Sequence, residues 1–165
     1  MTAAGLQRVD RESAVASADK LELRVWLRLL TCTNLIERQV RAKLRERFGT
    51  TLARFDLLSQ LDRAPGGLTM GELSSRLMVT NGNVTALASA LIDEGLVNRE
   101  PHPSDRRSSR LRLSPEGKHV FDAMTPAHEV WIDEMMAGLS RGELAQLMTL
   151  LGKLKDAARR RRGRA

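Results

Sequence analysis

The sequence predicts a mainly α-helical fold, with six helices and one small β-hairpin. The first reason is that apolar residues recur every three or four positions along most of the 165 residues, which is the period of an amphipathic helix. The second is that this period changes to two near residues 96–113, where polar and apolar side chains alternate as in a half-buried strand. With 42% hydrophobic and 28% charged residues, the chain has the composition of a folded domain.

The longest predicted helix covers residues 21–48 and ends at Gly49, a residue that suits the left-handed conformation found after many helices. One continuous apolar stripe along it consists of Leu21, Val25, Leu29, Cys32, Ile36, Val40, Leu44 and Phe48. The average helix of a globular domain has about three turns and is much shorter than this one. A long helix with an unbroken stripe is typical of an oligomer interface.

Two shorter helices are predicted next. One runs over about residues 52–63 and is followed by the turn sequence of residues 64–67, Ala-Pro-Gly-Gly. The other runs over about residues 70–78, and Thr69 and Glu72 have the spacing of a capping box at its start.

A fourth predicted helix, which Thr80 can cap, has two different faces. The apolar face consists of Val84, Leu87, Ala88 and Leu91. The opposite face carries the small residues Gly82, Thr85, Ala86 and Ser89, and Asn81 and Asn83 flank the helix start. Such a helix fits the major groove of DNA, where Asn can pair with adenine and Thr or Ala methyl groups can contact thymine. The alternative is that Thr80 is only a cap and residues 81–83 only a turn.

The hairpin follows Gly95, with strands predicted near residues 96–97 and 109–113 and a basic tip between them. Together with the preceding helices it makes a winged helix-turn-helix. Arg106 and Arg107 at the tip suit a narrow minor groove, whose negative potential attracts guanidinium groups. The alternative is that they are solvated loop charges.

Two helices complete the prediction. Ser114 caps the first, Pro115 takes its first position, and it extends to about Gly138. Ser140 caps the second, which carries Leu144, Leu147, Leu151 and Leu154 in line. This stripe and that of the first helix exceed what one small domain can cover, so we expect a dimer through the N- and C-terminal helices.

The predicted organisation has three parts. Residues 1–18 form a flexible N-terminal segment, residues 19–154 a folded domain, and residues 155–165 a basic tail. Within the domain, residues 52–114 form the winged lobe, and residues 19–48 and 115–154 form dimerisation helices.

The net charge of +7 is concentrated in two segments. Residues 155–165 hold six basic side chains against Asp156, and residues 98–112 hold five arginines against Glu100 and Asp105. Such a distribution indicates a polyanionic partner. The alternative is a solubilising surface with a loose tail.

Three motifs make the chain resemble the MarR family of bacterial transcription regulators. They are Leu73-(x)3-Leu77-Met78-Val79-Thr80-Asn81-Gly82-Asn83-Val84-Thr85, then Leu91-(x)3-Gly95-Leu96-Val97-Asn98-Arg99, then Asp105-Arg106-Arg107 leading into Leu113-Ser114-Pro115-Glu116-Gly117. The resemblance implies a homodimer, a palindromic double-stranded DNA operator and, usually, repression relieved by a small molecule. It places Thr80 to Ala86 at the major groove and Arg106 or Arg107 in the minor groove. Ala86 and Ala90 depart from the family, where a long polar residue is common, so which residues read bases stays open.

The resemblance also implies an effector site between the DNA-binding lobe and the dimerisation helices. Trp26, Met124, His128 and Trp131 are the candidates for lining it, and the alternative is that they fill the dimer core. The segment from Met124 to Trp131 is similar to family members that respond to aromatic acids or their coenzyme A thioesters. Cys32 is the candidate for a redox-sensing alternative, but its place on the apolar stripe predicts a buried, inert thiol.

Other functions find little support in the sequence. His102, His119 and His128 lack the spacing of metal ligands, and no phosphate-binding glycine loop or nucleophile elbow is found, so we expect no metal, no cofactor and no enzyme activity. The remaining alternative is a winged-helix module that binds another protein.

The expected location is the cytoplasm, with no membrane partner. The first twenty residues lack an apolar segment of a secretory signal, and no apolar run approaches the roughly 18 residues of a spanning helix. The single cysteine excludes an intrachain disulfide and fits a reducing compartment.

Overall fold

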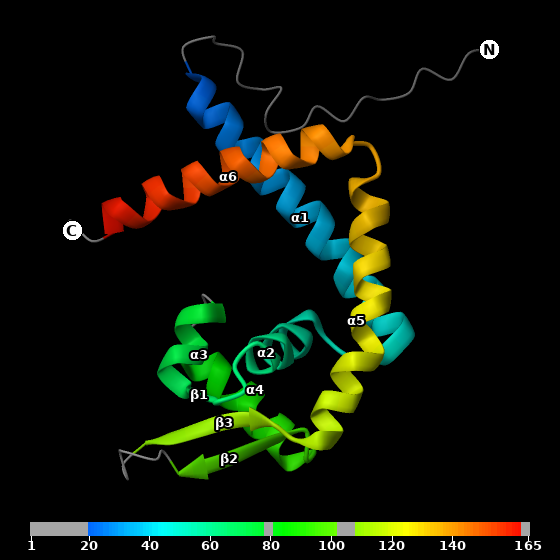
Figure 1. Cartoon of the computed structure of the whole chain (residues 1–165), viewed down its shortest axis with the longest axis vertical. Coiled ribbons are helices and arrows are strands. Elements are labelled where there is room, and N and C mark those ends of the chain that lie inside the picture. Colours follow the sequence, from blue (N-terminus) through cyan, green and yellow to red (C-terminus); the bar gives the residue numbers. More distant parts are fainter. Residues whose placement is uncertain (1–19, 78–80, 102–107, 163–165) are drawn as a thin grey trace. The chain divides into compact units, whose positions relative to one another are not determined.

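The computed structural model describes residues 20–77, 81–101 and 108–162, and these form six helices and a three-stranded sheet (Figure 1). The helices are α1 (Leu21–Phe48), α2 (Leu52–Asp62), α3 (Met70–Leu77), α4 (Asn81–Asp93), α5 (Pro115–Met136) and α6 (Arg141–Arg162). The strands are β1 (Leu68–Thr69), β2 (Val97–Pro101) and β3 (Ser109–Leu113). The chain divides into two compact units, the first ending at Met124 and the second beginning at Thr125. The predicted mainly helical class with a small hairpin is confirmed.

Helix α1 ends where the sequence predicts, because Gly49 adopts a left-handed conformation with φ 61°. Its amide donates to the carbonyl oxygen of Arg45 at 3.1 Å. Only the C-terminal half of the apolar stripe is buried in the first unit, at Val40 and Leu44. Cys32 is exposed, so the prediction of a buried thiol is wrong for this chain. The turn of α1 that carries Cys32 is not covered by the other elements of the first unit.

The core of the first unit lies between α2, α3, α4 and the sheet. Its fully buried side chains include Leu57, Leu58, Leu61, Leu73, Val84, Leu91, Val97 and Leu111. Phe55 on α2 contacts Phe121 on α5, with ring centroids 5.4 Å apart. These contacts hold the helix pair α3–α4 and the sheet on one scaffold (Figure 1).

The sheet has one more strand than the predicted hairpin. Its order is β1-β3-β2 and both pairings are antiparallel, with Leu68 opposite Leu111 and Val97 opposite Leu113. The short strand β1 pairs with the edge of β3 that a two-stranded hairpin would leave open. A third strand of this kind adds stability that an isolated hairpin lacks.

Helix α5 begins as predicted, with Ser114 as its cap. The Ser114 hydroxyl accepts a hydrogen bond from the amide of Gly117 at 2.9 Å and donates one to the carbonyl of Gly95 at 2.6 Å. A side chain at Gly117 would place its Cβ atom 1.9 Å from the carbonyl oxygen of Leu96. The start of α5 is therefore packed directly against the turn that leads into β2.

The second unit consists of the rest of α5, which contains Pro126, and of α6. Ser140 and Glu143 form a capping box at the start of α6, as the Ser140 amide and hydroxyl donate to the Glu143 carboxylate. The helix continues to Arg162, so part of the predicted basic tail is helical. None of the helices described is long and apolar enough to cross a membrane.

Candidate nucleic-acid interface

Helix α4 has the two faces that the sequence predicts. Val84, Ala88 and Leu91 have no exposed surface, while Leu87 is half-buried. Asn83, Thr85, Ala86 and Ser89 are exposed on the other face. Thr80 lies outside the described residues, and so do the side chain of Asn81 and the exposure of Gly82. The four described residues of the predicted reading face are therefore gathered on one accessible surface of the helix.

A capping box fixes the start of α3, the first helix of the pair. The Thr69 amide and hydroxyl donate to the Glu72 carboxylate at 2.8 and 2.9 Å, and the Glu72 amide donates to Thr69 Oγ1 at 3.3 Å. The two bonds from Thr69, with smaller effects of Arg110 and Arg76, lower the pKa of Glu72. A charged carboxylate at a helix start is stabilising, so α3 begins at a defined residue.

An ion pair links α2 to the far end of α4. The Arg54 guanidinium donates to both carboxylate oxygens of Glu94, the first at 2.7 Å. Bidentate pairing of this kind fixes orientation as well as distance. The end of α4 is therefore tied to the scaffold from outside the core.

Lys118 on α5 makes a second polar link to the scaffold. Its ammonium group lies 3.1 Å from the Asp62 carboxylate at the end of α2 and also donates to Asp122. The bonds to Asp122 and Asp62 raise the pKa of Lys118. This link complements the buried contact between Gly117 and the chain before β2.

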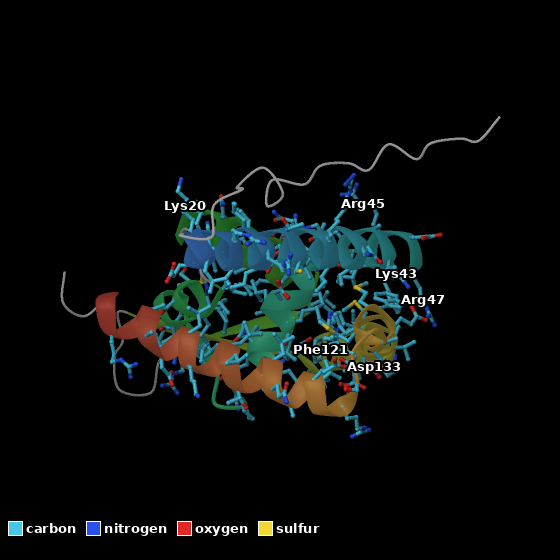
Figure 2. All side chains as sticks on the ribbon, turned by 90° about the horizontal axis from the view of Figure 1, so that it is seen from above. Lys20, Lys43, Arg45, Arg47, Phe121 and Asp133 are labelled. Carbon is cyan, nitrogen blue, oxygen red and sulfur yellow. The ribbon has the colours of Figure 1, made fainter. Side chains whose placement is uncertain are left out.

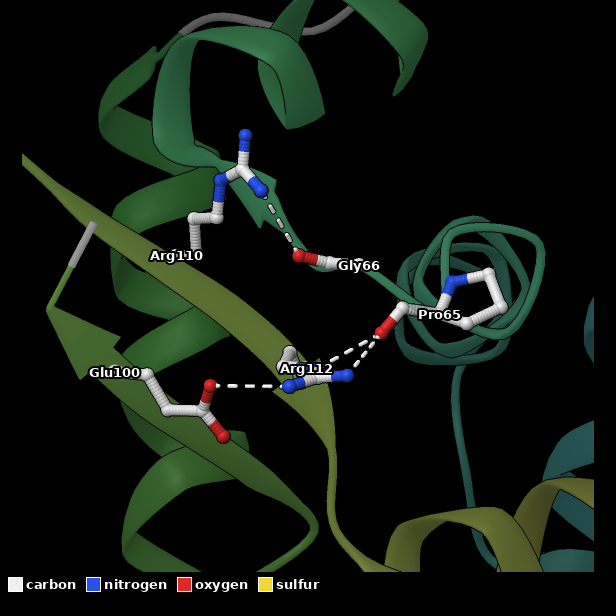
Figure 3. A network of polar contacts seen from close by, with 5 residues as sticks. All are labelled: Pro65, Gly66, Glu100, Arg110 and Arg112. Atoms are coloured by element: carbon white, nitrogen blue, oxygen red, sulfur yellow. Dashed lines mark hydrogen bonds and ion pairs between the residues drawn. The ribbon is translucent and has the colours of Figure 1, made fainter. Parts of the chain in front are cut away.

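The basic residues of the sheet fall into two groups. Arg106 and Arg107, the predicted minor-groove residues, lie outside the described residues. Arg110 and Arg112 on β3 face the turn between α2 and β1, where their guanidinium groups donate to the carbonyl oxygens of Gly66 and Pro65 (Figure 3). Arg112 also pairs with Glu100 on β2 at 3.3 Å. Two of the five arginines counted in this segment are thus held within the fold.

Further positive charge lies on α1. Lys20 precedes the helix and Arg45 is on its last turn, and both side chains point outward (Figure 2). Arg41, one turn earlier, pairs with Glu37 at 3.0 Å. On α6 the described side chains of Arg159 and Arg160 are exposed.

The four predicted effector residues are divided between the two units. Trp26 is 57% exposed on α1, and Met124 is buried at the end of the first unit. His128 is half-buried and Trp131 buried in the second unit, and burial lowers the pKa of His128. A hollow of about 680 Å³ in the first unit is lined by residues of α1, α2 and α5, and Met124 is the one of the four that lines it.

Comparison with known proteins places this fold in one family. Residues 48–108 match the model of the MarR family. The chain is 31% identical to the transcriptional regulator YcgE of Bacillus subtilis over 139 residues, which cover 84% of this chain and 86% of that protein. It is 26% identical to the transcriptional activatory protein BadR of Rhodopseudomonas palustris over 157 residues, covering 93% and 89%.

A solved structure of the same family is similar to this chain over most of its length. The MarR family transcriptional regulator from Silicibacter pomeroyi is 30% identical and has a TM-score of 0.70, with 84% of this chain and 96% of that chain covered. The winged arrangement of α3, α4 and the sheet, described above, is therefore shared along with the sequence. The chain belongs to the MarR family of transcriptional regulators.

Proposed function

We propose that this regulator binds a palindromic operator in double-stranded DNA as a homodimer, in the cytoplasm. The observation that carries the proposal is the division of α4 into an apolar face, on which Val84, Ala88 and Leu91 are buried, and an exposed face of Asn83, Thr85, Ala86 and Ser89. A helix anchored in this way can enter the major groove without losing its packing. The proposed base-reading residues are these four with Thr80, Asn81 and Gly82.

The wing supplies the second contact of the proposal. Arg106 and Arg107 are proposed to enter the minor groove, because they belong to the segment that joins β2 to β3. The amides at the start of α4 can bind phosphates. Sequence would then be read mainly by α4, and affinity would come mainly from charge.

The homodimer is supported by apolar side chains that the single chain leaves exposed. On α1 these include Leu21, Val25 and Trp26, and on α6 they include Met148, Leu150 and Leu154. Met148 is 75% exposed, and a larger exposed apolar surface marks an interaction site. A two-fold dimer would present two copies of α4 about 34–36 Å apart, one turn of DNA.

The proposed sign of regulation is repression, released when an aromatic acid or a coenzyme A thioester binds near Met124, His128, Trp131 and Trp26. The adjacent positions of His128 and Trp131 on one face of α5 support a site for a planar ligand. Activation is the second candidate, because the relative BadR is a transcriptional activatory protein. A reporter gene under the bound promoter distinguishes them, since deletion of the regulator raises expression in the first case and lowers it in the second.

A binding titration with the DNA flanking the regulator's own gene tests the proposal. We expect tight binding to a palindrome that weakens steeply with salt, because phosphate contacts release counterions. Binding that is insensitive to salt or to sequence would contradict it and favour a protein-binding module. A thermal-shift series with aromatic carboxylates and their thioesters tests the effector, because a ligand of the folded dimer raises its melting temperature.

A further inference from the structure

The turn between α2 and β1, residues 63–67, is fastened to the wing by the guanidinium group of Arg112. Nε and Nη2 of Arg112 donate to the Pro65 carbonyl oxygen at 2.9 and 2.5 Å, and Nη1 donates to Glu100 Oε2 at 3.3 Å (Figure 3). Arg110 adds a bond to the Gly66 carbonyl oxygen at 3.2 Å. The planar guanidinium group of Arg112, on β3, thus binds both the turn and β2. Because its donors lie in one plane, these bonds fix the orientation of the turn relative to the two strands.

Close packing at Gly67 supports the same contact from the side of the turn. Gly67 has φ +77°, a conformation that favours glycine. A Cβ atom on Gly67 would lie 2.7 Å from Cγ of Arg112 and 2.9 Å from the carbonyl oxygen of Leu111. The turn therefore lies directly on the stem of Arg112 and on the backbone of β3, with no space for a side chain.

The position of this contact in the chain connects the two DNA-binding elements. Leu68, directly after the turn, pairs with Leu111 on β3, and α3 begins at Met70. Moving the turn relative to β3 would therefore move the α3–α4 pair relative to the wing. Arg112 and Gly67 lie at the contact between the turn before α3 and the wing strand β3.

We propose that Arg112 and Gly67 are positioning residues for DNA binding: they set the distance between α4 and the wing, and they act through the wing. The inference rests on the proposed function, in which the wing segment contacts the minor groove. It predicts that a neutral change in the turn has the effect of removing a wing arginine. A residue with only a general stabilising role would not have this effect while the protein remains folded.

The decisive variant is Gly67→Ala, with Gly66→Ala as its matched control. A Cβ atom on Gly66 meets nothing within 4 Å, and Gly66 has no positive φ, so its carbonyl can still accept from Arg110. Operator affinity is measured across a series of salt concentrations for both variants and for Arg107→Ala, at a temperature where circular dichroism shows each to be folded. If Gly67→Ala does not fold, Arg112→Gln tests the same contact by removing the guanidinium group.

We expect Gly67→Ala to bind the operator about tenfold more weakly, the loss of about one groove contact. The slope of log K against log salt should fall by at least the amount seen in Arg107→Ala, because the wing segment also carries Arg106, although Gly67→Ala changes no charge. Combining either Gly67→Ala or Arg112→Gln with Arg107→Ala should weaken binding no further, within about twofold, because both act on one contact. Gly66→Ala should bind like the unaltered protein.

Two results would overturn the inference alone. One is wild-type affinity in folded Gly67→Ala or Arg112→Gln while Arg107→Ala is weakened, and the other is losses that multiply in the double variants. If Arg107→Ala itself binds with unchanged affinity, the wing contact of the proposed function is wrong and the positioning inference fails with it. If the unaltered protein does not bind the operator DNA, the proposed function fails at the first step.

Discussion

Arg54 near the start of α2 holds the carboxylate of Glu94, just beyond the end of α4, through two hydrogen bonds from its guanidinium group. The hydrogen bond from Arg54 lowers the pKa of Glu94 below its ordinary value of 4.5. Because the pair is half-exposed, its contribution to stability is small. It nevertheless gives the lobe a defined dependence on pH.

We expect Glu94→Gln to reduce the free energy of unfolding by about 0.5–1 kcal/mol at pH 7. The contribution of a carboxylate with a lowered pKa is complete above its unfolded value and is lost as the pH falls through the folded value. The difference between the variant and the unaltered protein should therefore shrink below pH 4.5. Urea unfolding at pH 7 and at acid pH measures it, with Glu46→Gln as the control, and a difference independent of pH would contradict the assignment.

Gly117→Ala should destabilise the first unit by about 3 kcal/mol or more, because its Cβ atom would lie 1.9 Å from the Leu96 carbonyl oxygen. Gly71→Ala on α3 is the matched control, since its Cβ atom meets nothing within 4 Å. Alanine there should stabilise the helix by up to about 1 kcal/mol. Urea unfolding of both variants checks the contrast, and equal stabilities would show that the chain near Leu96 moves aside freely.

Asn83→Ala should lower the preference for operator over unrelated DNA by about 1–3 kcal/mol, as expected for a lost contact to a base edge. Asn34→Ala on α1 makes the same chemical change at another exposed position and should leave the preference unchanged. Fluorescence anisotropy with the two DNAs measures both. An equal loss of affinity for the two DNAs in Asn83→Ala would show that Asn83 binds the backbone and does not read sequence.

Leu151→Glu should convert the proposed dimer to a monomer, because it places a charge in the apolar stripe of α6. Leu147, Leu151 and Leu154 on this stripe are 36%, 38% and 49% exposed in the single chain. Thr149→Glu adds the same charge on the opposite side of the helix and should leave the dimer intact. Sedimentation gives the mass of each, and a monomeric unaltered protein would end the dimer proposal.

Removing the chain after Asp156 should reduce affinity for unrelated DNA more than it reduces the preference for the operator. The segment removed contains the exposed Arg159 and Arg160, and counterion release predicts a slope in log K smaller by about 0.9 for each lost phosphate contact. Titrations at several salt concentrations measure this slope. Loss of the operator preference itself would instead identify the tail as a sequence reader.

Local signals in the sequence predicted the starts of α3, α5 and α6 and the end of α1. Gly49 and the capping residues Thr69, Ser114 and Ser140 each act within a few residues of the helix they delimit, so their effect can be deduced without the fold. Strand β1 was not predicted, because two residues are too few to show a period.

Features that depend on distant segments could not be deduced in the same way. Arg110 and Arg112 donate to carbonyl oxygens more than forty positions earlier in the chain, and a carbonyl leaves no signal in a sequence. Cys32 was expected to be buried because it lies on the apolar stripe, but a stripe shows which side of a helix is apolar and not how far its neighbours extend. Trp26, in the same half of α1, is also exposed.

The bonds from Arg112 end on main-chain oxygen, which every amino acid carries. Exchange of the ring at Pro65 for another side chain leaves the acceptor present, so position 65 can change in composition where Gly67 cannot. Its length has no such freedom, since one inserted residue would carry the acceptor out of reach of Nε and Nη2. The contact with Arg112 therefore constrains the number of residues between α2 and β1 and the glycine at position 67, and leaves the side chain at position 65 open.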